Sequence, residues 1–63
     1  MKNKITLNDI NGKAYTISNF EDFLQHIKTY HTLHGVGDGS LHEENGYYFR
    51  VTPEFYEMLL SQV

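Results

Sequence analysis

The sequence predicts a small α+β domain in which an antiparallel sheet carries both helices on one face. Three observations predict this class: two Asn-Gly turn signals flanked by apolar residues, a helical pattern after each, and the similarity of two segments 34 residues apart. A chain of 63 residues is expected to form a single domain over residues 1–63. The predicted order is ββαββα, built from two hairpin-plus-helix units at about residues 4–34 and 40–63.

The internal similarity aligns residues 7–18 (LNDINGKAYTIS) with residues 41–52 (LHEENGYYFRVT). The leucine, asparagine and glycine of this pattern are identical in the two segments, and other positions match in chemical kind. The pattern indicates a repeated structural unit. Asn-Gly hairpins are common, however, so the predicted fold class does not depend on the repeat.

The first hairpin is predicted to turn over residues 9–13, through a type I turn that is closed by a left-handed Gly12. This three-residue loop places the following residues opposite each other: Asp9 and Lys13, Leu7 and Tyr15, Ile5 and Ile17. The large apolar residues then share one face of the hairpin. The face opposite is expected to carry Thr6, Asn8, Ala14 and Thr16.

The same loop applied to residues 43–47 pairs Leu41 with Phe49 and directs both toward the core, together with Tyr47 and Val51. An open face of the sheet would then carry polar and aromatic side chains from both hairpins. On the second hairpin, and at the residue just before it, the side chains expected on this open face are Ser40, His42, Tyr48 and Arg50.

The first helix is predicted over residues 19–34, beginning with a Ser18–Glu21 capping box and ending before Gly35. Its predicted core stripe consists of Phe20, Phe23, Leu24, Ile27 and Tyr30.

The second helix is predicted from Glu54 to about Gln62, after a Thr52 cap and Pro53. The first helix would be about 24 Å long and a five-residue strand about 17 Å, so the carboxyl end of the first helix is expected to project beyond the sheet.

Composition excludes several classes of function. The net charge of −3 does not provide the basic field that broad nucleic-acid binding needs. The chain has no cysteine, and no apolar run follows its amino-terminal lysines, so neither a disulfide nor a signal peptide is expected. No segment is apolar over the length of a membrane span. A cytoplasmic protein without membrane contact is expected.

Metal and cofactor sites are not predicted. His31, His34, His42 and a nearby carboxylate could in principle supply enough zinc ligands. Histidines three residues apart on a helix, without a catalytic carboxylate between them, match no zinc signature. The glycine loop at residues 35–39 follows a helix carboxyl end, where a phosphate is disfavoured.

Catalysis is not expected either, because the chain has no cysteine, and its serines fall at capping, connecting and exposed helical positions. A domain of this size is also expected to lack a pocket of several hundred Å³.

The sequence therefore favours a small non-enzymatic interaction module that binds a protein partner or its own copy. The candidate interaction surface comprises Tyr30, His31, Leu33, His34, His42, Tyr48 and Arg50. The alternative is weak single-stranded nucleic-acid binding through Tyr48 and Arg50 on the open face, with Lys4 and Lys13 at its margin.

Overall fold

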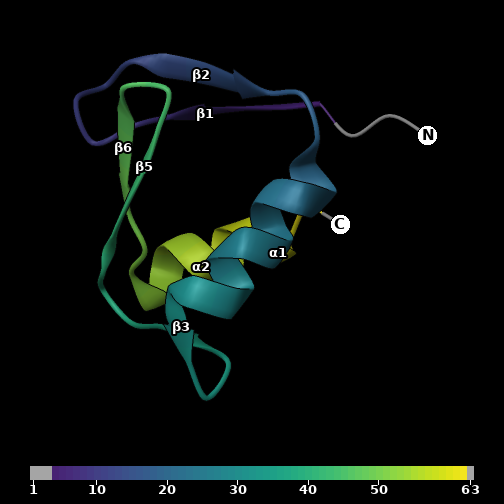
Figure 1. Ribbon diagram of the computed structural model, residues 1–63, viewed down its shortest axis with the longest axis vertical. Helices are drawn as coiled ribbons and strands as arrows, with labels where there is room; N and C mark the ends of the chain where they lie inside the picture. The colour runs from purple at the N-terminus through teal and green to yellow at the C-terminus, as the bar shows by residue number, and fades with distance from the viewer. Residues whose placement is uncertain (1–3, 63) are drawn as a thin grey trace.

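The computed structural model describes residues 4–62, and the chain folds there as an α+β domain of helices and antiparallel strand pairs (Figure 1). Its elements in order are β1 (Ile5–Asn8), β2 (Ala14–Ile17), α1 (Phe20–Tyr30), β3 (Thr32–Leu33), β4 (Val36–Gly37), β5 (Leu41–Glu44), β6 (Tyr47–Arg50) and α2 (Pro53–Leu60). Residues 1–3 and Val63, which the single-domain prediction includes, lie outside the described residues.

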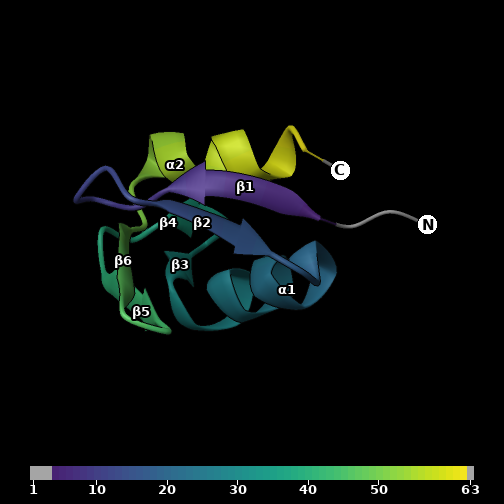
Figure 2. The same cartoon turned by 90° about the horizontal axis from the view of Figure 1, so that it is seen from above.

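The strands form three separate two-stranded sheets, β1–β2, β3–β4 and β5–β6, so the prediction of one sheet is wrong. The β1–β2 hairpin lies over the two helices, and β5–β6 runs in a different direction at one end of the molecule (Figures 1 and 2). The two longer hairpins touch at the turn of the first one, where the Ile10 N–H donates to the Tyr48 carbonyl of β6 at 2.8 Å. Contact through a loop gives no continuous ladder, which is why the sheets stay separate.

The first hairpin has the predicted register, with Leu7 opposite Tyr15 and Ile5 opposite Ile17. Its loop is closed by Gly12 at a φ of +80°, as expected for the three-residue turn. The short side chain of Asp9 supports this loop, since its Oδ1 accepts from the N–H groups of residues 11 and 13, each at 2.9 Å. The predicted division into an inner apolar face and an outer polar face is confirmed.

The second hairpin has a different register from the one predicted. Its loop is the two-residue Asn45-Gly46 turn, with φ values of +53° and +84°, and His42 rather than Leu41 lies opposite Phe49. The orientation of β6 was predicted correctly, but the shift by one residue reverses β5, so that His42 points inward and Leu41 outward. The repeat therefore does not extend to the register of the two hairpins.

Helix α1 is shorter than predicted, because it ends at Tyr30 rather than at His34. The chain then forms the small β3–β4 hairpin, in which His34 and Gly35 take φ values of +55° and +79° and make a two-residue turn. The His34-Gly35 pair, interpreted from sequence as a helix end, is a hairpin turn. This hairpin has no counterpart after α2 in the described residues, so the exact ββαββα order is not confirmed. The residues that were expected at a projecting helix end form this hairpin instead.

The cap of α1 is Asn19 rather than Ser18, and its Oδ1 accepts from the Asp22 N–H at 3.2 Å. Thr52 caps α2 as predicted, with Pro53 in its first turn. The buried core draws on both predicted units and consists of Leu7, Ile17, Phe20, Phe23, Ile27, Phe49, Val51, Tyr56 and Leu59. Tyr30, expected in the core stripe, is instead 67% exposed.

Candidate functional site

The two faces of the β5–β6 hairpin carry different kinds of side chain. The inner face, directed into the molecule, presents His42, Glu44, Tyr47 and Phe49. The outer face is defined here as Leu41, Glu43, Tyr48 and Arg50, all of which are exposed. Each face brings together residues that the predicted register would have separated.

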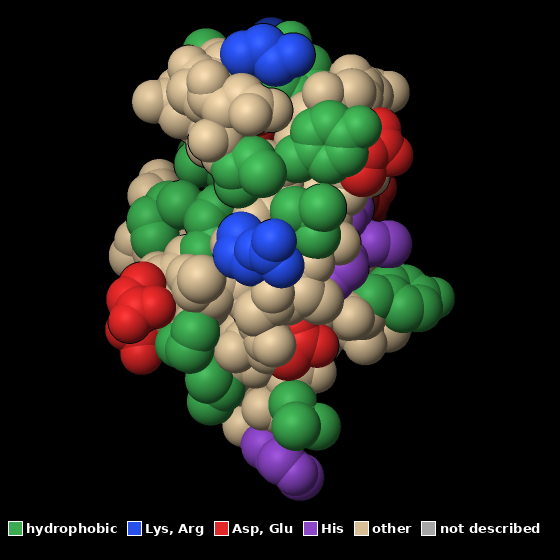
Figure 3. Space-filling view, turned by 90° about the vertical axis from the view of Figure 1, so that its left-hand side faces the viewer, with side chains coloured by type: hydrophobic (Ala, Val, Ile, Leu, Met, Phe, Trp, Pro, Cys, Tyr) green, Lys and Arg blue, Asp and Glu red, His purple; other side chains and the backbone are tan. Residues whose placement is uncertain are grey.

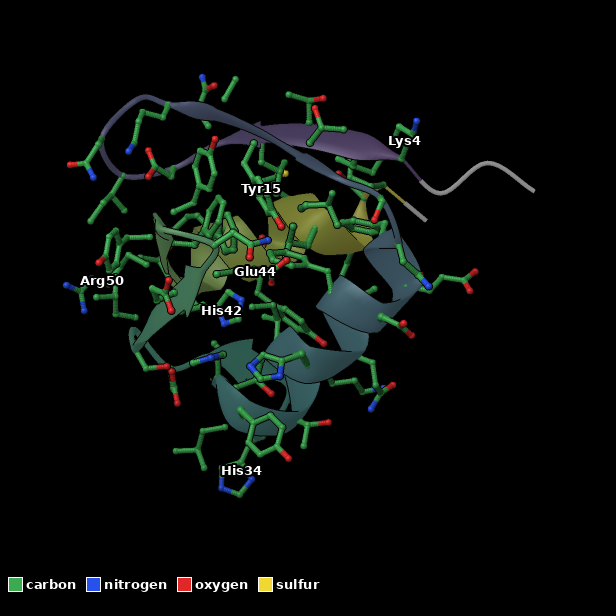
Figure 4. The ribbon with its side chains drawn as sticks, turned by 45° about the horizontal axis from the view of Figure 1, so that its top comes forward. Lys4, Tyr15, His34, His42, Glu44 and Arg50 are labelled. Atoms are coloured by element: carbon green, nitrogen blue, oxygen red, sulfur yellow. The ribbon has the colours of Figure 1, made fainter. Side chains whose placement is uncertain are left out.

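The outer face combines apolar groups with a cation. Leu41 pairs with Arg50 across the hairpin, and Ile10 lies beside Tyr48 through its backbone hydrogen bond. Figure 3, which looks onto this side of the molecule, shows hydrophobic side chains around a Lys/Arg side chain, and Arg50 points outward in Figure 4. The Arg50 Nη1 donates to the Gly39 carbonyl at 3.0 Å, which restrains the guanidinium.

The seven residues of the predicted interaction surface do not form one surface. Tyr48 and Arg50 lie on the outer face. Tyr30, Leu33 and His34 are exposed near the β3–β4 hairpin, and Figure 4 shows His34 far from Glu44 and Arg50. His42, expected on an open face, is only 7% exposed.

Three histidines meet between the carboxyl end of α1 and the inner face of β5. His26 is on α1, His31 directly follows that helix, and His42 is on β5. One nitrogen from each ring lies within 4.8 Å of the other two. The ring centroids are 4.7 Å apart for His26 and His42, 5.2 Å for His31 and His42, and 5.5 Å for His26 and His31.

His26 takes the place that the sequence analysis considered for His34, which lies on the β3–β4 turn. A 3.6-residue wheel puts His31 and His34 together only if the helix continues past residue 30. The sequence signal for His26 is its position five residues before His31. This spacing brings the two rings together only when the helix ends between them, as it does at Tyr30.

A chain of hydrogen bonds holds the His42 ring in place. Its Nε2 lies 3.0 Å from Glu44 Oε1, and the Tyr15 hydroxyl donates to Glu44 Oε2 at 2.7 Å. Asn45 Nδ2 donates in turn to the Tyr15 hydroxyl at 2.9 Å. Figure 4 shows Glu44 between Tyr15 and His42. Burial acts to raise the pKa of Glu44, but the hydrogen bonds from Tyr15 and His42 outweigh it, so this pKa lies below its ordinary value.

The His31 ring is also held by a hydrogen bond. Its Nδ1 lies 2.7 Å from the Ser40 hydroxyl oxygen. Hydrogen bonds from the side chain and the backbone N–H of Ser40 lower the pKa of Asp38. Burial, and then the neighbouring His42 and His26, lower the pKa of His31 itself, which favours its neutral form.

An open pocket of about 310 Å³ adjoins the cluster, a larger hollow than the sequence analysis expected. It is lined by Tyr15, Ile17, Ser18, Asn19, Asp22, Phe23, His26, His42 and Glu44. Two of the three clustered histidines therefore line a space that can admit a small ligand.

Comparisons with protein-family models, with curated proteins and with solved structures found no match to this chain. Neither helix within residues 4–62 has the length and apolar character that a membrane crossing requires.

Proposed function

We propose that this chain is a small non-enzymatic module of the cytoplasm that binds a protein partner through the outer face of the β5–β6 hairpin. The observation that carries the proposal is the exposed group of apolar side chains around Arg50. Leu41 is 42% exposed and Tyr48 is 39% exposed, and Ile10 beside them is exposed as well. Tyrosine and arginine are enriched among the residues that contribute most to protein interfaces.

The chemistry of this face favours one kind of partner. Arg50 uses Nη1 for the Gly39 carbonyl, and a guanidinium has further N–H donors that suit a carboxylate. Glu43 lies opposite Tyr48, so a partner carboxylate would be repelled there and attracted at the Arg50 end. We therefore expect the partner to present an Asp or Glu next to apolar side chains.

Nucleic-acid binding through Tyr48 and Arg50 is the alternative, because an exposed aromatic ring beside an arginine can stack on bases. A net charge of −3 opposes it, since phosphate binding depends on clustered cations. A second copy of the chain could also cover the outer face. The experiment therefore has to distinguish a protein partner, a nucleic acid and a second copy.

A photo-crosslinking amino acid, benzoylphenylalanine, placed at position 48 in cells would identify what covers the outer face. The matched control places it at Tyr30, another exposed aromatic residue outside this face. We expect a protein cross-link at position 48 that is absent at position 30. Arg50→Glu, made in the same background, should remove the cross-link, and Leu33→Asp, an exposed leucine on the small hairpin, should leave it.

Three results would overturn the proposal. Equal cross-linking at both positions would indicate a nonspecific surface. A nuclease-sensitive cross-link at position 48 would favour the nucleic-acid alternative. A cross-link only to a second copy, with a dimer in analytical ultracentrifugation that Arg50→Glu dissociates, would replace the partner by self-association.

A further inference from the structure

The three clustered histidines have the donor types and positions of a transition-metal site. Imidazole nitrogen is a preferred ligand of Zn²⁺, with a metal–nitrogen distance of about 2.0–2.1 Å. Tetrahedral geometry then requires nitrogens about 3.3 Å apart. The nitrogens of His26, His31 and His42 already lie within 4.8 Å of one another, so small side-chain rotations close the remaining gap. His26 is exposed and lies on the last turns of α1, where its side chain can rotate most easily.

One nitrogen in each of two rings is already engaged by an oxygen, as in many metal sites. A metal-binding histidine usually donates its second N–H to a carboxylate or another oxygen, which fixes the tautomer and orients the ring. His42 uses Nε2 toward the Glu44 carboxylate, which leaves Nδ1 as its metal-binding atom. His31 uses Nδ1 toward Ser40, which leaves Nε2.

Anionic groups behind these contacts offset the charge of an ion. The Glu44 carboxylate lies 3.0 Å from His42 Nε2, and the Asp38 carboxylate lies behind Ser40, accepting from the Ser40 N–H at 2.9 Å. Glu44 is further positioned by the Tyr15 hydroxyl at 2.7 Å.

From this geometry we propose that His26, His31 and His42 bind one Zn²⁺ ion, with the fourth coordination position open toward the adjoining pocket. Three protein ligands and one open position is the arrangement of zinc sites that accept water or another small ligand. The three donors of the cluster are imidazoles, which suit Zn²⁺ and, in competition, Cu²⁺. The proposal does not depend on the outer face or on its partner.

The test uses the full chain, freed of metal by a chelator that is then removed. Titration with Zn²⁺ against a chromophoric competitor should give one ion per chain, and Co²⁺ should give the strong visible absorption of four-coordinate geometry. His26→Ala should weaken Zn²⁺ binding at least 100-fold. His34→Ala is the matched control, since it removes an exposed histidine outside the cluster, and should leave the affinity unchanged.

A second variant probes the oriented ring without removing a ligand. Glu44→Gln should weaken Zn²⁺ binding about 10- to 100-fold, as for other groups that orient metal-binding histidines. Nitrogen-15 spectra of the imidazole rings should show His42 bound through Nδ1 and His31 bound through Nε2. Circular dichroism of each metal-free variant checks that the fold is retained. His26 is the decisive position, because its side chain is exposed and its replacement by alanine should not unfold the domain.

No binding at 100 µM Zn²⁺ would overturn the proposal. Equal losses in His26→Ala and His34→Ala would also overturn it, because they would indicate adventitious binding to surface histidines. Binding of one ion that His26→Ala leaves unchanged would place the metal elsewhere, with the same consequence.

Discussion

Gly37, in β4, is the position where an added methyl group tests the fold most directly. A Cβ built there would lie closest to the Thr52 carbonyl oxygen and 2.8 Å from the Val51 carbonyl oxygen, whereas ordinary contacts begin at 3.4 Å. Both neighbours are backbone atoms, so no flexible side chain can move away. Gly37→Ala must therefore push β4 and the start of α2 apart by more than half an ångström.

The magnitude follows from the position of these atoms. Val51 is fully buried, and Thr52 caps α2, so a displacement there disturbs both the core and a helix end. Overpacking usually costs about 1–3 kcal/mol, and contact with backbone places this case near 3 kcal/mol. A domain of this size has a total stability of roughly 3–9 kcal/mol. At roughly 4–8 °C per kcal/mol, the melting temperature should fall by 12–24 °C.

Thermal unfolding followed by circular dichroism measures this effect. Gly39→Ala is the matched control, because Gly39 has a φ of +81° but open space around its Cβ position. In the control the added Cβ meets no neighbour but is strained by the positive φ, so this variant should be destabilised by about 1 kcal/mol. If Gly37→Ala melted within a few degrees of the original protein, or no lower than Gly39→Ala, β4 could not be packed against Val51 and Thr52.

Three further predictions concern the turns and the surface. Gly12→Ala should lower the free energy of unfolding by about 1 kcal/mol, since its φ is +80°, and an unchanged urea midpoint would contradict the turn geometry. Burial acts to raise the pKa of Asp9, but N–H groups of Lys13, Tyr48 and Asn11 outweigh it and lower this pKa. The stability from Asp9 is therefore present above its unfolded pKa of 3.8 and lost as the pH falls through its lower folded value, so Asp9→Asn should flatten the acid limb of a stability–pH curve. Leu33→Asp should change stability by no more than about 0.5 kcal/mol, because the side chain is 64% exposed, and a larger loss in urea unfolding would place Leu33 in a packed environment.

Local sequence was sufficient where the chemistry of a few adjacent residues decides the backbone. Asp9 and Gly12 determine the loop of the first hairpin, and the loop determines its register. Thr52 and Pro53 determine the start of α2. The alternation along β6 correctly places Phe49 inside, because its neighbours on either side are polar or amphipathic.

The outer part of the candidate site was only partly predictable. Tyr48 and Arg50 were expected to share an exposed face, and they do, since both lie on the strand whose orientation was clear. Leu41 was missed because the alternation in β5 is ambiguous: leucine and histidine compete for the inner positions. Only the register with β6 decides which of them is buried.

The histidine cluster depended entirely on tertiary structure. The helical pattern of the sequence continues past Tyr30, so sequence alone gives no reason to end α1 there. A helix that continued would place His34, rather than His26, beside His31. The β3–β4 hairpin ends the helix because Gly37 can approach the backbone of residues 51–52, a contact between segments far apart in the chain. Local propensity thus determined the turns and caps, whereas the choice between two acceptable local conformations was made by long-range packing, which no short window of sequence contains.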